Sequence, residues 1–168
     1  MKVVRVPAVE HVRFPTPADG ARFLQFAERV EPCYRHRVSE QLQPHIILAP
    51  ELGKQLGESL RHGEVTGDGA ARVWAGSFSN AAPGHAAQFA LDLLLGASGD
   101  TVLLATLLQY LPTRDPGVVS ILAPQEAKLT AVLLGATPEV GRDAWFALTA
   151  IAEFSPVAAN ALQQAVAR

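Results

Sequence analysis

The stretch that most constrains the fold is Asp100–Leu111, which is apolar around almost its whole circumference when it is read as a helix. Only Thr101, Ala105 and Gln109 form a narrow polar or small line, with Thr106 beside it. A helix without a broad polar face must be covered by other elements on nearly all sides. It is also shorter than the roughly 20 apolar residues that cross a bilayer. We therefore predict that this stretch forms the central helix of a helical core.

Composition extends the same expectation to the rest of the chain. The 168 residues fit a single domain, residues 1–168, that is long enough to bury a sizeable core. Hydrophobic residues make up 49% and charged residues only 18%, below the roughly 25% usual for soluble domains. Ala and Leu dominate the apolar set of the second half, which favours helices. We predict a mainly α fold, either a helical bundle or a short helical-repeat array.

A small β element is expected in the N-terminal half, so that residues 1–81 form a mixed α+β portion and residues 82–168 an all-helical one. Lys2–Val6 is rich in β-branched residues and predicts a short strand, and Val9–Phe14 is a second extended candidate. Glu64–Thr66 and Ala71–Ala75 flank Gly67-Asp-Gly69, which predicts a β-hairpin.

Three helices accompany this β element in the first half. Thr16 followed by Pro17 and Asp19 is a helix-start pattern, and that helix is expected to bury Phe23, Phe26, Ala27 and Val30. Cys33–Gln43 is a weaker helix candidate, followed by a short buried strand or connection at residues 45–49. Pro50–Leu60 is the third, and its glycines at 53 and 57 allow a neighbouring element to approach closely.

The second half predicts short helices marked by prolines and glycines. The expected starts are Pro83, Asp100, Pro116, Pro124, Pro138 and Pro156, and Gly135 is expected to end the helix that Pro124 starts.

The segment from Thr137 to Ala152, followed by a second short helix after Ser155, resembles a HEAT repeat. The resemblance rests on Pro138, Glu139, Val140, Arg142, Ala144, Ala147 and Leu148. It implies stacked helix pairs that supply surfaces for protein partners. A plain irregular helical bundle is the alternative interpretation of the same residues.

Charge and motifs narrow the classes of function. The formal net charge is -2, and the basic residues near Arg35 are offset by neighbouring acids, so we do not expect nucleic-acid binding. The single cysteine excludes an intrachain disulfide, and no signal-peptide core or membrane-length apolar run is recognised, so a cytoplasmic protein without membrane contact is expected. No phosphate loop, dinucleotide fingerprint or nucleophile elbow occurs. We therefore assign no catalytic residue, cofactor or metal, and lean away from an enzyme.

One cluster nevertheless keeps an enzyme or ligand-binding protein open as the alternative. Cys33 and His36 stand three residues apart, Glu40 follows four residues later, and His45 lies nine residues beyond His36. Such side chains could bind Zn²⁺ or pair a thiol with a base. Arg35 and its neighbours disfavour a cation there, so the competing interpretation is a solvated amphipathic helix.

The preferred hypothesis is a non-enzymatic protein-interaction or assembly module that associates with itself, as a dimer, or with a protein partner. Residues 85–168 contain only four Lys or Arg and seven Asp or Glu, too few for broad charged faces on every helix. Phe146 falls on the side of Arg142 and Glu153, where an isolated bundle would need a polar group. These three residues are the candidate partner-binding surface.

Overall fold

The computed structural model describes residues 16–96 and 100–167, and within these ranges the regular structure is helical and includes no strand. The helices are α1 (Pro17–Ala27), α2 (Arg35–Leu48), α3 (Pro50–Arg61), α4 (Asp68–Ala81), α5 (Pro83–Leu95), α6 (Thr101–Tyr110), α7 (Pro116–Leu122), α8 (Glu126–Val140), α9 (Arg142–Ile151) and α10 (Pro156–Val166), with 3-10 turns η2 (Pro32–Tyr34) and η3 (Ala123–Gln125). The prediction of a mainly α fold is confirmed. The expected strands at 2–6 and 9–14 lie outside the described residues.

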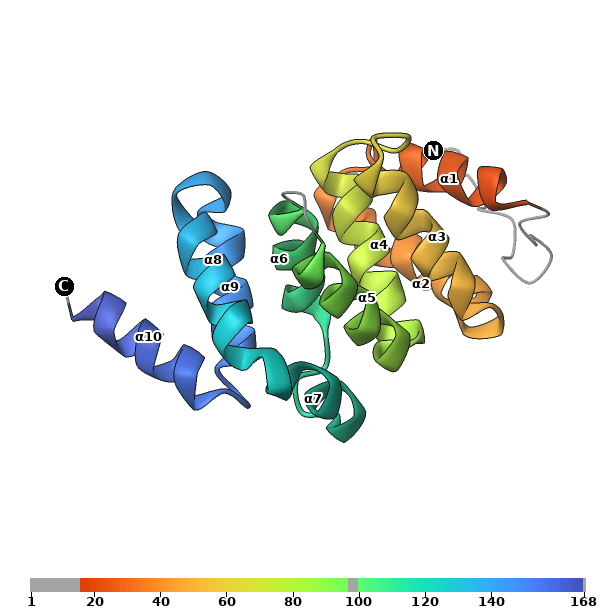
Figure 1. Cartoon of the computed structure of the whole chain (residues 1–168). Coiled ribbons are helices and arrows are strands. Elements are labelled where there is room, and N and C mark those ends of the chain that lie inside the picture. The colour runs from red at the N-terminus through yellow and green to blue at the C-terminus, as the bar shows by residue number, and fades with distance from the viewer. Residues whose placement is uncertain (1–15, 97–99, 168) are drawn as a thin grey trace.

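The helices follow one another across the molecule, with α1 near one end and α10 at the other (Figure 1). Helix α4 packs between α2 and α6, and α6 packs in turn against α9. Helices α2, α4, α6 and α9 thus form one row. Beside this row, α5 packs between α3 and α7. Side chains from neighbouring helices of one row can therefore meet on a shared face.

The predicted central helix is confirmed as α6. It contacts α4, α5, α8 and α9, and its residues Leu104, Leu107 and Leu108 are fully or almost fully buried. A nearly all-round apolar helix gains stability only where neighbours cover it on several sides, and these four helices do so.

An aromatic cluster fills the core between α3, α4 and α5. Trp74 and Phe89 meet edge to face with their ring centroids 5.6 Å apart, and Phe78 packs against both. Gly53 and Gly57 make room for these rings, since a Cβ at Gly57 would lie 2.7 Å from both Phe89 and Trp74. The indole nitrogen of Trp74 also donates a 2.8 Å hydrogen bond to the carbonyl of Gly53. The expectation of a close approach at these glycines is confirmed.

Several predicted helix starts are confirmed by their capping bonds. Thr16 and Asp19 form a capping box at α1. Asp115 accepts hydrogen bonds from the backbone of residues 117 and 118, and Ser155 accepts one from Ala158. The buried face of α1 differs from the prediction, because Leu24 and Ala27 are buried while Phe26 is 60% exposed.

The predicted β-hairpin around Gly67-Asp-Gly69 is wrong. Gly67 has a φ of +110° and directs the chain into helix α4. It does not form part of a two-residue hairpin turn. From Asp68 onward α4 buries Ala70, Val73 and Trp74 on helical spacing, and that burial outweighs the local turn pattern. The mixed α+β character expected for residues 1–81 is therefore not seen in the described part of that range.

Two further boundaries differ from the prediction. Helix α2 continues through Pro44 to Leu48, so residues 45–49 form no strand. Helix α8 continues past Gly135 and Pro138 to Val140, and the next helix begins at Arg142 instead of Pro138. The chain turns at Gly141, whose φ of +55° suits glycine.

By length and apolar composition alone, one continuous helical stretch in the described part of the chain, Pro116–Ala136, could cross a membrane. It contains the 3-10 turn η3. Its residues Val118, Leu122, Leu129 and Leu133 are buried within this fold. In this fold 28% of the apolar window of that stretch is buried.

Candidate functional site

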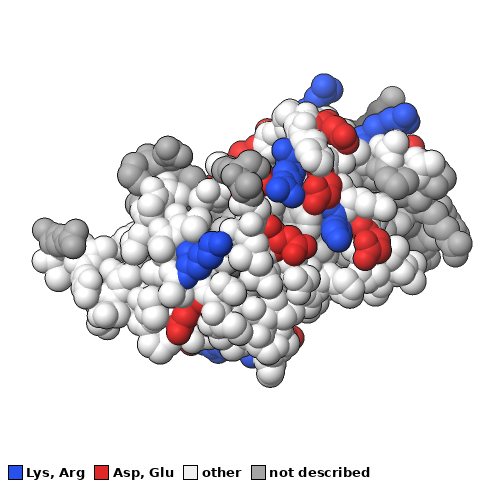
Figure 2. Space-filling model, in the orientation of Figure 1, with Lys and Arg blue, Asp and Glu red and all other residues white. Residues whose placement is uncertain are grey.

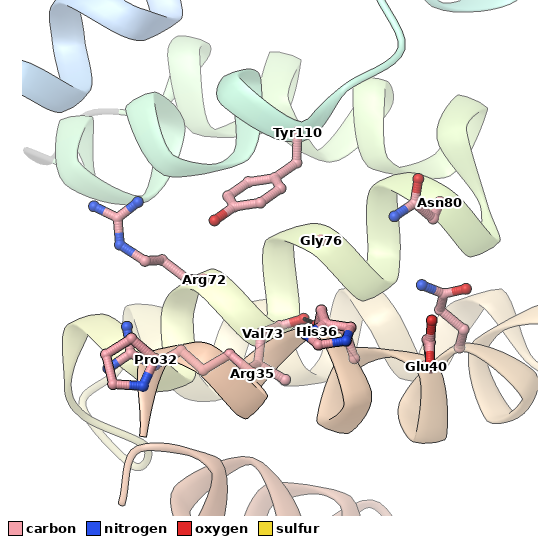
Figure 3. A pocket seen from close by; sticks show the side chains of 11 residues that line it. Pro32, Arg35, His36, Glu40, Arg72, Val73, Gly76, Asn80 and Tyr110 are labelled. Atoms are coloured by element: carbon pink, nitrogen blue, oxygen red, sulfur yellow. Dashed lines mark hydrogen bonds between the residues drawn. The ribbon is translucent and has the colours of Figure 1, made fainter. Parts of the chain in front are cut away.

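A pocket of about 420 Å³ opens where α2, α4 and α6 meet (Figure 3). Its walls carry more polar side chains than the cores on either side of it. The lining residues are Pro32, Arg35, His36, Ser39, Glu40 and Gln43 from η2 and α2, Arg72, Val73, Gly76 and Asn80 from α4, and Tyr110 from α6.

Helical spacing brings the polar lining residues to one face of each helix. The lining positions of α2 and of α4 recur every three or four residues. Ser39 links the two helices, because its hydroxyl donates to the Val73 carbonyl at 3.3 Å, whereas the Ser77 hydroxyl donates at 2.6 Å to Val73 of its own helix and lies 3.3 Å from the Ser39 carbonyl. Gly76 lies at the floor of the pocket, where a Cβ would lie 3.5 Å from the ring of Tyr110.

Arg72 is fixed in the pocket wall by two carboxylates. Its Nε donates to Asp68 at 2.9 Å and its Nη2 donates to Asp143 of α9 at 2.8 Å. Burial disfavours the charged guanidinium, but the hydrogen bonds to Asp68, Asp143 and Tyr110 outweigh it and raise the pKa of Arg72. Arg72 therefore stays charged and ties α4 to α9.

Arg35 has a different environment. Its Nε is buried and has no hydrogen-bond partner in the described part of the chain. The neighbouring carboxylate of Glu28 accepts the backbone N–H of Ala70 at 2.7 Å. Arg35 Nη2 and Glu28 Oε2 both lie close to Gly69, yet the two side chains form no ion pair among the described residues. The guanidinium of Arg35 thus retains unused donors at the pocket.

The predicted partner-binding residues lie on and just after α9. Phe146 is 43% exposed, and the guanidinium of Arg142 lies over its ring at 5.1 Å from the centroid. Glu153 forms a 3.1 Å ion pair with Arg114. The spacing of four residues places Arg142 and Phe146 on one stripe of α9, and Glu153 follows in the turn after the helix. Asp143, which binds Arg72, precedes Phe146 by three residues, so this stripe adjoins the pocket.

The Cys33, His36, Glu40 and His45 cluster is only partly assembled. His36 and Glu40 both line the pocket. Cys33 lies outside α2 in the turn η2, is exposed, and has its thiol 3.8 Å from Glu31. His45 follows His36 by nine residues of one helix, a rotation of about 180° that puts it on the opposite face. Among the described residues, no group of three or more His, Cys, Asp or Glu could hold a metal ion.

Sequence reasoning missed most of the pocket. Arg72, Asn80 and Tyr110 come from two helices well separated in sequence from α2, and the first part of one of those helices was predicted as a β-hairpin. The only available signal was the polar stripe of α2, on which His36 and Glu40 share a face.

A second pocket, of about 370 Å³, lies between the start of α4 and the start of α6. Asp100, expected only to cap the central helix, forms an ion pair with Arg61 here at 2.7 Å and makes no side-chain capping bond. The charges of Arg61 and Asp100 compensate each other.

Comparison of the chain with protein-family models, with curated proteins and with solved structures gives no match.

Proposed function

We propose that this chain is a non-enzymatic protein-interaction or assembly module that associates with itself as a dimer. The observation that carries the proposal is the exposed ring of Phe146 on α9. Aromatic side chains anchor many protein interfaces, because they bury a large area at a small entropic cost. Arg142, stacked on the ring, supplies the polar rim of such a contact.

The sparse charge of the C-terminal helices supports the same proposal. In the face shown in Figure 2, few Lys, Arg, Asp or Glu side chains cover the region of α8 to α10, whereas they gather over the N-terminal helices. Val157 of α10 is 41% exposed. Apolar surface of this kind commonly marks an interface.

The HEAT resemblance is part of this proposal. Stacking of α4 between α2 and α6, and of α6 on α9, supports a short helical array whose faces receive a partner. Pro138 lies inside α8 instead of at a helix start, so the motif that suggested the resemblance is displaced relative to the helices. A cytoplasmic location, without nucleic-acid or membrane contact, belongs to the same proposal.

Light scattering of the purified chain at micromolar concentration tests the self-association. We expect a mass near twice the 17.9 kDa of the single chain. A mass near 17.9 kDa at every concentration would remove the homodimer. The interaction module would then need a different protein as its partner, with a mapped footprint that includes Phe146.

A small enzyme or a metal- or ligand-binding protein is the second candidate, favoured by the presence of His36 and Glu40 in the pocket. Metal analysis of the purified chain separates the two candidates. Stoichiometric zinc that is lost in His36→Ala would support the second candidate. Absence of zinc from both the wild-type chain and His36→Ala would favour the interaction module.

A further inference from the structure

The two arginines of the α2–α4–α6 pocket differ in whether their guanidinium N–H donors already have partners. Arg72 is engaged by Asp68 and Asp143. Arg35 has a buried Nε without a partner and forms no ion pair within the described ranges. The buried Nε is closed to solvent and so to a ligand, but the terminal amino groups of Arg35 also have no hydrogen bond in the described part of the chain, and a carboxylate is the acceptor that pairs best with a guanidinium. The pocket is therefore prepared for an acidic group at Arg35.

The two ends of the pocket are chemically different. Figure 3 shows Arg35 and Arg72 toward one end and Glu40 and Asn80 toward the other. Eight residues of α4 separate Arg72 from Asn80, which is about 12 Å along the helix axis. An extended peptide advances about 3.3 Å per residue, so three to four residues, roughly, bridge this length.

The remaining lining residues suit a peptide backbone. Asn80 and Gln43 each present a donor and an acceptor, as a peptide unit does. Tyr110 offers an aromatic wall beside Gly76.

We propose that this pocket binds an extended segment of a partner protein that places an Asp or Glu side chain on Arg35. The guanidinium of Arg35 donates to the carboxylate, while Asn80 and Gln43 pair with the peptide backbone. Glu40 repels a second acid at the far end and so fixes the direction of the segment. The site rests on the proposed interaction function but uses a surface other than the one that holds the dimer.

The test uses the full chain and an array of short, acetylated and amidated peptides in which each position carries Glu, Gln or Lys. We expect the bound peptides to share an acid at one fixed position. In fluorescence anisotropy, Glu→Gln at that position weakens binding about tenfold or more. Arg35→Gln loses the same factor and then binds the Glu and Gln peptides equally.

Matched variants keep the result interpretable. Arg37→Gln removes an exposed arginine from the same helix and is expected to bind as wild type. Gly76→Leu fills the floor and abolishes binding, whereas Gly76→Ala, whose Cβ would sit 3.5 Å from Tyr110, retains the acid preference. If Arg35→Gln does not fold, this glycine pair decides whether the pocket is the binding site.

Three outcomes would overturn the proposal: no peptide binds, the bound peptides share no acid, or the acid preference persists in Arg35→Gln. Failure of the proposed dimer is distinguishable from these outcomes. A monomeric wild-type chain that binds acidic peptides through Arg35 would contradict self-association and leave the pocket proposal intact.

Discussion

At the scale of single residues, Gly53 and Gly76 occupy the interiors of two helices but meet different surroundings. A Cβ on Gly53 would overlap the ring of Phe78 in the core. A Cβ on Gly76 would make ordinary contact with Tyr110 at the floor of the pocket. The first glycine is required by packing, whereas the second has room for a methyl group.

This contrast predicts opposite effects of the same substitution. Gly53→Ala should lower the free energy of unfolding by about 1–3 kcal/mol, because the rings of the aromatic cluster must shift. Gly76→Ala should leave it unchanged or raise it by up to about 1 kcal/mol, because alanine favours the helix. Urea denaturation of both variants measures the difference. Equal losses at the two positions would contradict the packing described at α3.

His45 gives a prediction about pH. Burial lowers the pKa of His45 below 6.5, so the unfolded chain takes up a proton there before the folded chain does. Its contribution to stability is therefore complete above about pH 6.5 and is lost as the pH falls toward the lower pKa of the folded state. His45→Gln should make the melting temperature less sensitive to acid in this window. The control is His85→Gln at an exposed position, which should keep the wild-type dependence of melting temperature on pH. The same wild-type dependence in His45→Gln would contradict the explanation.

At the scale of elements, α6 has the role that its sequence predicts. Leu107→Ala should cost about 2–5 kcal/mol, because the residue is fully buried among neighbouring helices. Val102→Ala on the same helix removes a 55% exposed side chain and should cost less than about 0.5 kcal/mol. Thermal denaturation compares the two, and similar melting temperatures would contradict the central position of α6.

Helix starts and helix ends were unequally predictable. Thr16, Asp115 and Ser155 satisfy backbone donors within a few residues, so their patterns fix helix starts locally. Gly67, which precedes α4, makes no side-chain capping bond. Burial of α4 and the turn at Gly141 decided the boundaries near Gly67 and Gly135, and both depend on packing that the local sequence does not express.

At the scale of the whole molecule, the candidate partner surface and the pocket also differ in how far the sequence alone predicts them. The exposure of Phe146 beside Arg142 follows from helical spacing within one segment, so the sequence predicts it. The pocket needs three helices in register, and its contacts from Ser39 to Val73 and from Arg72 to Asp143 join residues 34 and 71 positions apart. No local pattern encodes such pairs, so the pocket appears only once the helices are packed.

Self-association through Phe146 is the central claim, and light scattering of two matched variants tests it most directly. Phe146→Ser removes the exposed ring from α9, and Val166→Ser removes an even more exposed apolar side chain from the end of α10. We predict a dimer for wild type and Val166→Ser, and a mass near 17.9 kDa for Phe146→Ser, with unchanged helical circular dichroism in all three. A Phe146→Ser variant that remains as dimeric as wild type would contradict the account.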